Sequence, residues 1–133
     1  MKALLVDDSK TMRSMLRRIM VEAGFETCEA GDGQEALDVI GASEELPDVA
    51  LVDWNMPVMD GLQFVTAVRN NPDLRRITLV MVTTESEQSQ IVRALAAGAH
   101  EYMIKPFTAD ALVDKLTFLG LLSEPQQEAE VVW

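Results

Sequence analysis

The stretch VALVDWNMPVMDG, residues 49–61, decides the fold of this chain. Its first four residues are apolar and rich in β-branched side chains, and Asp53 ends the run abruptly. Such a run is typical of a strand that is buried on both faces of a parallel sheet. Residues 54–57 then predict a turn, and Gly61 opens a helical pattern. Ligands of open parallel sheets bind beyond the carboxyl ends of the strands, so Asp53 is either a helix cap or a working carboxylate.

The same succession of apolar run, polar end and helical pattern is repeated along the chain. Further strands are expected at residues 3–6, 25–30, 77–83 and 102–104. Helices are expected at residues 10–23, around 36–40, at 61–69, at 87–97 and from 109 onward. The alternation predicts an α/β fold, a parallel sheet with helices on both of its faces.

Two side chains mark expected helix starts. Ser9 and Thr108 each precede a helical pattern and are typical N-caps. In the first helix the apolar residues fall at helical spacing, so we expect them to share one buried stripe. These residues are Met12, Met15, Leu16, Ile19 and Met20.

Length and composition indicate one folded domain. The chain has 133 residues, of which 48% are hydrophobic, and it carries a formal net charge of -11. That charge repels phosphate backbones and anionic membranes, so we expect neither nucleic-acid binding nor membrane binding. The single cysteine, Cys28, cannot form an internal disulfide, and a cytoplasmic location is expected. Residues 123–133 are mostly acidic and polar, and predict a flexible tail after a domain at 1–122.

The strand ends carry complementary chemistry. The first strand ends in Asp7 and Asp8, the third in Asp53, the fourth in Thr83 and the fifth in Lys105. In a parallel sheet these groups share one edge, where crowded carboxylates attract a hard cation such as Mg²⁺. A hydroxyl and an ammonium suit the oxygens of a phosphoryl group. Together the groups predict a carboxylate nucleophile that accepts a phosphoryl group.

Each of these residues also has a purely structural interpretation. The two N-terminal aspartates could simply face a helix N-terminus, where negative charge is favoured. Thr83 could be an ordinary residue of a strand end, and Lys105 a solvated surface charge. His100, the single histidine, is interpreted as a solvated turn residue. The combination at four of the five expected strand ends is what favours chemistry.

The sequence resembles the receiver domains of two-component response regulators, and among them the CheY-like chemotaxis type. The resemblance covers residues 2–122 and rests on five motifs. These are LLVDDS at 4–9, AGDGQEAL at 30–37, DWNMPVMDG at 53–61, VTTE at 82–85 and AGAHEYMIKPF at 97–107. It implies a flavodoxin-like (βα)5 doubly wound fold with strand order 2-1-3-4-5. It also implies a cis peptide bond between Lys105 and Pro106.

The resemblance implies a role for each site residue. Asp53 would be the phosphoacceptor, and Mg²⁺ or Mn²⁺ would be held by Asp8, Asp53 and the backbone carbonyl of Asn55. Asp7 would act on the metal through a water molecule.

Other residues would form the phosphate contacts and the switch. Lys105 and Thr83 would contact the phosphoryl oxygens, and Tyr102 would turn inward with Thr83. Asn55 and Glu85 stand where family members tune the lifetime of the phosphoaspartate, and Thr84 could restrict access to the site.

The implied activity is not that of a conventional enzyme. It is Mg²⁺-dependent self-phosphorylation from a phosphodonor, followed by autodephosphorylation. The phosphodonor would be a CheA-like sensor histidine kinase, and the target a protein such as a flagellar motor switch protein. The target would be bound through Ile91, Tyr102, Ile104 and their surroundings, with no DNA involved.

Three alternatives remain open from the sequence. The first is a phosphorelay intermediate or phosphate sink. The second is a haloacid-dehalogenase-like phosphatase, although that family has a second aspartate where this chain has Asn55. The third is an interaction module that works without phosphorylation. A dinucleotide-binding domain is excluded because no G-x-G-x-x-G follows the first strand.

Overall fold

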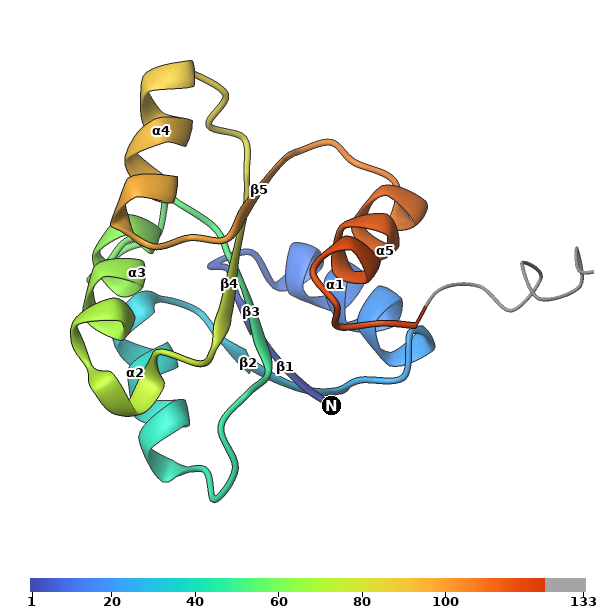
Figure 1. The fold of residues 1–133 in the computed structure, drawn as a ribbon, viewed down its shortest axis with the longest axis horizontal. Helices are drawn as coiled ribbons and strands as arrows, with labels where there is room; N and C mark the ends of the chain where they lie inside the picture. The colour runs from blue at the N-terminus through green and yellow to red at the C-terminus, as the bar shows by residue number, and fades with distance from the viewer. Residues whose placement is uncertain (124–133) are drawn as a thin grey trace, which may run out of the picture.

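A computed structural model describes residues 1–123 as a five-stranded sheet surrounded by helices (Figure 1). The strands are β1 (Lys2–Val6), β2 (Glu26–Ala30), β3 (Val49–Val52), β4 (Thr78–Thr83) and β5 (Glu101–Ile104). The helices are α1 (Lys10–Glu22), α2 (Gly33–Ala42), α3 (Gly61–Asn70), α4 (Gln88–Ala97) and α5 (Ala109–Phe118). A short 3-10 turn, η1 (Pro72–Leu74), follows α3 and was not predicted. The predicted α/β alternation is confirmed.

All four strand pairs are parallel, and the sheet order is β2-β1-β3-β4-β5. This is the order that the family resemblance implied. The chain first builds outward from β1 to β2 and then crosses to β3, so the order reverses between β1 and β3. Val6 pairs with Val52 at this point, which brings the residues after the two strands side by side. Crevices at such reversals are where doubly wound sheets bind ligands.

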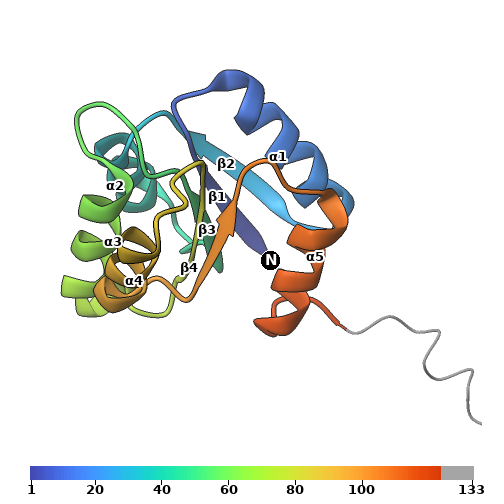
Figure 2. The ribbon, with the colours of Figure 1, turned by 90° about the horizontal axis from the view of Figure 1, so that it is seen from above.

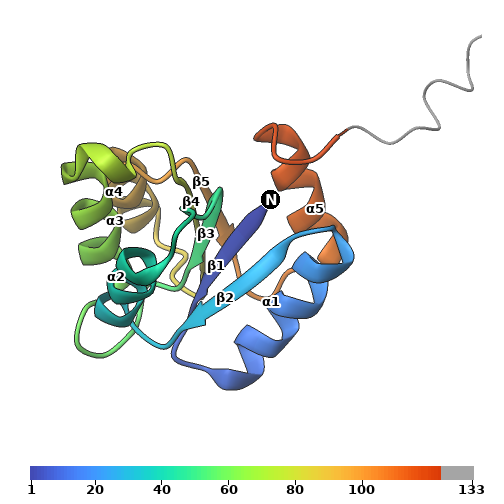
Figure 3. The ribbon, with the colours of Figure 1, turned by 90° about the horizontal axis from the view of Figure 1, so that it is seen from below.

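The helices form two layers. Figures 2 and 3 show α1 and α5 on one face of the sheet and α2, α3 and α4 on the other. Side chains that alternate along each strand supply the two cores, as the strand period requires. On β1, Leu4 and Val6 pack with the α2–α4 layer, whereas Ala3 and Leu5 pack with the α1–α5 layer. All four residues are fully buried, as expected for a strand covered on both faces.

Side-chain caps fix where the helices begin. Ser9 and Thr108 cap α1 and α5, each by accepting a backbone N–H three residues ahead, as predicted. Asp32 does the same for α2, and Asp60 forms a capping box with Gln63 at the start of α3. These caps fix the loops that precede the helices, including the one that follows Asp53.

The expected apolar stripe of α1 is only partly buried. Leu16 and Met20 are buried, but Met15 is 37% exposed, so the prediction was wrong for that residue. Met15 instead lines a surface pocket together with Thr84 and Phe107. Cys28 lies in β2 as predicted and is half-buried. The predicted tail, from residue 124 onward, lies outside the described residues.

Candidate functional site

The backbone ladder brings Asp7 and Asp53 together at the carboxyl end of the sheet. The N–H of Asp53 donates to the carbonyl of Val6 at 2.9 Å, and the N–H of Asp7 donates to that of Ala30 at 3.1 Å. Both bonds extend the strand pairing by one residue beyond the strands. The positions of the two carboxylates are therefore fixed by the most rigid part of the fold.

The predicted aspartates form one acidic cluster. One carboxylate oxygen from each of Asp7, Asp8 and Asp53 lies within 4.8 Å of the others. Asp7 is 1% and Asp53 is 9% exposed, whereas Asp8 is open to solvent. Hard carboxylate oxygens at this spacing are the donors that Mg²⁺ and Mn²⁺ prefer, and an open side leaves room for water ligands. The donor set thus fits a divalent cation.

Both carboxylate oxygens of Asp7 already have partners. Oδ1 accepts the backbone N–H of Ser9 at 2.9 Å, and Oδ2 accepts the ammonium of Lys105 at 2.8 Å. The same ammonium lies 3.6 Å from Oδ2 of Asp53. Lys105 thus lies at the same sheet edge as the aspartates, as predicted, and there it compensates two buried carboxylates. The Lys105–Pro106 peptide bond is cis, also as predicted.

Burial raises the pKa of Asp53 above its ordinary value. The positive charge of Lys105 and the hydroxyl of Thr83 act in the opposite direction, and the negative charge of Asp7 adds to the rise. The upward shift shows that the ionised carboxylate is costly here without a further cation. A bound divalent ion would relieve that cost.

The loop after Asp53 leaves no room for a side chain at Gly61. A Cβ atom there would collide with the backbone oxygen of Asp53. The Gly61 N–H donates to the Trp54 carbonyl at 2.9 Å, and the Trp54 N–H donates to Oδ1 of Asp53 at 2.8 Å. At the loop tip Val58 has a positive φ of 67°, rare for a β-branched residue, and is 83% exposed. The loop is closed tightly around Asp53.

A second set of contacts links the site to the β4–α4 loop. Thr83 is fully buried at the end of β4, and its hydroxyl accepts the N–H of Glu85 at 3.3 Å. The Tyr102 hydroxyl donates to the backbone carbonyl of Glu85 at 2.7 Å. Asn55 donates from Nδ2 to the Glu85 carboxylate at 3.4 Å. Glu85 therefore joins the Asp53 loop to β5.

The predicted target-binding residues differ in their exposure. Ile104 is 40% exposed on β5, and Ile91 on α4 is half-buried. Tyr102 is only 8% exposed and packs in the α2–α4 core, so in this structure it does not offer a surface. Burial raises the pKa of its hydroxyl, with Glu85 adding to the rise. Exposed apolar side chains that sequence reasoning did not single out, Val92 and Leu95, lie on α4.

Two contacts near the site were also missed by sequence reasoning. Arg13 on α1 donates from Nη1 to the carbonyl of Asp7 and from Nε to Glu29 at 3.1 Å, so it ties α1 and β2 to the acidic loop. The guanidinium of Arg93 on α4 lies 6.0 Å from the centre of the Trp54 ring. Neither residue belongs to a sequence motif. Each reaches its partner only in the folded structure, so no sequence signal identifies either contact.

An apolar pocket of about 440 Å³ adjoins the acidic cluster. Its lining comes from α1, the β4–α4 loop and the β5–α5 loop: Met12, Met15, Thr84, Lys105, Pro106 and Phe107. Thr84 is exposed at its rim. Thr84 and Lys105, whose ammonium contacts the two carboxylates, thus line the same pocket.

Comparison with known proteins agrees with this geometry. Residues 3–117 match the response regulator receiver domain model. The chain is 40% identical over 117 residues to the chemotaxis protein CheY1 of Helicobacter pylori and to the chemotaxis protein CheY of Pseudomonas aeruginosa. The match covers 87% of this chain and 94% and 93% of those proteins.

Solved structures lead to the same family. The chemotaxis protein CheY4 of Vibrio cholerae superposes with a TM-score of 0.80 at 37% identity, covering 88% of this chain and 96% of that one. A putative response regulator from Chloroflexus aurantiacus gives a TM-score of 0.82 at 32% identity, covering 89% and 95%. Among residues 1–123, none of the helices has the length and hydropathy needed to cross a bilayer. The chain belongs to the response regulator receiver domain family, with chemotaxis proteins of the CheY type among its relatives.

Proposed function

We propose that this chain is a phosphorylation-activated signalling switch in which Asp53 accepts a phosphoryl group from the phosphohistidine of a sensor kinase. The proposal is supported above all by the meeting of Asp53 with Asp7, Asp8 and Lys105 at one sheet edge. An oxygen of the Asp53 carboxylate attacks phosphorus while the bond from phosphorus to the histidine nitrogen breaks. The histidine retains the electron pair of that bond and takes up a proton.

A divalent cation would be held by Asp8, Asp53 and the backbone carbonyl of Asn55. Asp7 would act through a water molecule, an arrangement supported by the partners that both of its oxygens already have. When bound, Mg²⁺ or Mn²⁺ would neutralise charge that builds up on the phosphoryl oxygens. Receiver domains of this family bind Mg²⁺ at an acidic pocket, and the aspartate cluster fits that ion.

Lys105 and Thr83 would hold the phosphoryl group once it is transferred. The ammonium already lies between Asp7 and Asp53, so a small movement of a flexible side chain would bring it onto a phosphoryl oxygen. The Thr83 hydroxyl, now accepting the N–H of Glu85, can turn to donate instead. Asn55 and Glu85, joined across the site, would set the lifetime of the phosphoaspartate, and Thr84 would affect access from the pocket side.

The switch would act through a shift in populations. Phosphorylation favours an active state only by the contacts that differ between the two states. Movement of Thr83 would break its hydrogen bond with the N–H of Glu85. The carbonyl of Glu85 accepts the Tyr102 hydroxyl, so the change would reach Tyr102. Changes there would alter the surface formed by α4, β5 and α5, with Ile91 and Ile104 near the target. In this structure Tyr102 already occupies the inward position.

We assign the partners by family relationship. The relatives are chemotaxis proteins, which supports a CheA-like kinase as donor and a flagellar motor switch protein as target, at the cytoplasmic side of the cell. We retain residues 1–122 as the receiver domain. Family membership leaves the haloacid-dehalogenase-like alternative without support. A phosphorelay intermediate or phosphate sink uses the same chemistry and remains the second candidate.

The test is a transfer and capture experiment with purified proteins. A radiolabelled, phosphorylated CheA-like kinase is mixed with the chain and Mg²⁺, and the phosphorylated chain is then offered to a purified flagellar motor switch protein. We expect rapid transfer and capture only of the phosphorylated form. Transfer without phosphorylation-dependent capture would favour the phosphorelay or sink. Capture of the unphosphorylated chain with no transfer from the kinase would favour the interaction module that works without phosphorylation.

A further inference from the structure

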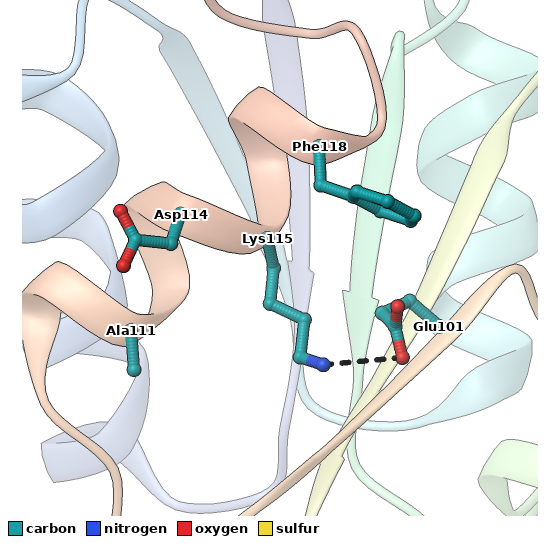
Figure 4. Close-up of a pocket in the computed structure, with 5 residues that line it drawn as sticks. All are labelled: Glu101, Ala111, Asp114, Lys115 and Phe118. Atoms are coloured by element: carbon teal, nitrogen blue, oxygen red, sulfur yellow. Dashed lines mark ion pairs between the residues drawn. The ribbon is translucent and has the colours of Figure 1, made fainter.

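A groove between α5 and β5 is not part of the acidic site. It has a volume of about 400 Å³ and is lined by Glu101, Ala111, Asp114, Lys115 and Phe118 (Figure 4). β5 is the last strand of the described sheet, so the groove runs along an edge that no other described strand covers. Its volume lies in the range of pockets that hold a single small ligand or one large side chain.

Phe118 supplies the large apolar side chain of this groove. It is the last residue of α5, is 81% exposed and projects across the groove toward β5 in Figure 4. Ala111 lies two turns earlier on the same face of α5. An aromatic ring left in water beside a concavity is a favourable surface to cover, since burying it removes a large apolar area from solvent.

Charge does not favour an acidic ligand here. The ammonium of Lys115 lies 3.3 Å from Oε1 of Glu101, and that oxygen also accepts the N–H of Tyr102 at 3.0 Å. The single cation of the lining is thus already paired, while Asp114 adds a second negative charge. Whatever occupies the groove must be held by apolar contact with Phe118 rather than by attraction to Lys115.

The chain itself continues from the end of this groove. After Phe118, Gly120 has a positive φ of 80°, and Leu121 donates its N–H back to the carbonyl of Leu116 at 2.9 Å, which reverses the chain direction. Leu121 and Leu122 then pack against the core beneath α1 and α5. The next part of the sequence is EPQQEAEVVW, residues 124–133. Its composition changes from seven mainly polar residues to Val131, Val132 and Trp133.

We propose that residues 131–133 dock into this groove of the same molecule, with Trp133 against Phe118. Seven residues, the length of 124–130, would have an r.m.s. span of roughly 15 Å as a random coil. The groove is shorter than this span, because Ala111 and Phe118, which line it, are seven residues apart on α5 and thus about 10.5 Å apart along the helix. Such a tether gives a local concentration on the order of millimolar, so an intrinsic Kd of about 1 mM would suffice for half occupancy.

Docking of this kind would regulate the proposed switch. It rests on the proposed function in one respect, that α5 and β5 form part of the target-binding surface. The docked segment would then compete with the target for that surface. The glutamates of the spacer and the acidic lining repel each other, so added salt should strengthen docking by screening them.

The test is NMR spectroscopy of the isotopically labelled full-length chain without Mg²⁺ or phosphodonor. We expect nuclear Overhauser contacts between the Trp133 indole and the Phe118 ring, unchanged on dilution and stronger in added salt. The variant V131S/V132S/W133S should abolish them and shift the amide signals of Ala111, Lys115 and Phe118. The signals around Asp53 should not change.

Matched variants separate docking from general effects. Phe118→Ala should release the Trp133 signals to free-peptide positions, whereas Val92→Ala, at a 56% exposed site on α4 outside the groove, should leave them unchanged. Free-peptide signals for Trp133 in the parent chain would overturn the proposal. Contacts that disappear on dilution would also overturn it, since they would come from a second molecule. Neither result bears on Asp53, because phosphorylation is measured separately.

Discussion

The ammonium nitrogen of Lys105 lies 2.8 Å from Oδ2 of Asp7, and both side chains are almost fully buried, at 12% and 2% exposure. The pair crosses the sheet edge from the β5 end to the β1 end. It is the contact that compensates the acidic cluster when no metal is bound. Removing either partner therefore leaves an uncompensated buried charge.

Lys105→Met should destabilise the chain at neutral pH in the absence of Mg²⁺. The methionine keeps most of the side-chain length but leaves Asp7 and Asp53 unpaired, and breaking a buried pair costs about 3–5 kcal/mol. The free energy of unfolding in urea measures this. Lys115→Met is the matched control, because its pair with Glu101 is much more exposed and should contribute under about 1 kcal/mol. Equal losses for the two variants would contradict this account of Lys105.

Mg²⁺ should raise the melting temperature. Binding to the folded state alone stabilises it by mass action, by about 2.7 kcal/mol at one hundred times Kd. Thermal unfolding in excess Mg²⁺ and in EDTA measures the shift, and Asp8→Asn should remove most of it. The same melting temperature in both solutions would contradict a metal site.

Asp53→Asn should stabilise the metal-free chain at neutral pH. The folded-state pKa of Asp53 is raised, mainly by burial, so the folded state binds the proton more tightly than the unfolded state. Stability is then lost as the pH rises from about 3.8 through the folded-state pKa, and Asn avoids that loss.

Melting temperatures without Mg²⁺ at several pH values test this. We expect the variant to melt a few degrees higher at pH 7 and the difference to shrink as the pH falls. Asp38→Asn, at an exposed position on α2, should show no such trend. A variant less stable than the parent at pH 7 would show that ionised Asp53 stabilises the fold.

His100 should make the chain less stable in mild acid. Its Nδ1 accepts the N–H of Leu79 at 3.1 Å and lies 3.0 Å from a guanidinium nitrogen of Arg69, so it must be unprotonated. Burial, and then the charge of Arg69, lowers the pKa of His100 below its ordinary 6.5. Stability is therefore complete above that pH and is lost as the pH falls from it through the folded-state pKa.

The measurement is the melting temperature between pH 8 and pH 5 for the parent and for His100→Gln. The parent should lose more stability on acidification than the variant, since titration of Asp53 is common to both. If the melting temperatures of the parent and the variant changed with pH in parallel, protonation of His100 would have no effect on stability.

Much of the fold was predictable because local signals agreed. The apolar runs before Asp7 and Asp53, with the caps Ser9 and Thr108, predicted strands and helices whose bounds differ from the observed ones by about a residue. Strand order was not predictable from periodicity, because a strand that is buried on both faces has the same apolar sequence pattern at any position in the sheet. It came from the resemblance, and the structure confirms it.

The site was predictable in its members but not in its contacts. Strand ends in a parallel sheet must share an edge, which brought Asp7, Asp53 and Lys105 together. The Lys105 ammonium lies closer to Asp7 than to Asp53. This preference depends on side-chain packing, which the spacing of residues in the sequence does not reveal. His100 was interpreted as a solvated turn residue, yet it accepts a hydrogen bond from a residue 21 positions away, which only the β4–β5 pairing reveals.

Phosphorylation from acetyl phosphate tests the central claim most directly. The chain is incubated with acetyl phosphate and Mg²⁺, and the added phosphoryl group is located by peptide mass spectrometry. We predict one phosphoryl group on Asp53, labelling strongly reduced in Asp8→Asn, and none in Asp53→Asn, a variant expected to remain folded. Undiminished labelling of Asp53→Asn would contradict the account, because the acceptor would then lie elsewhere.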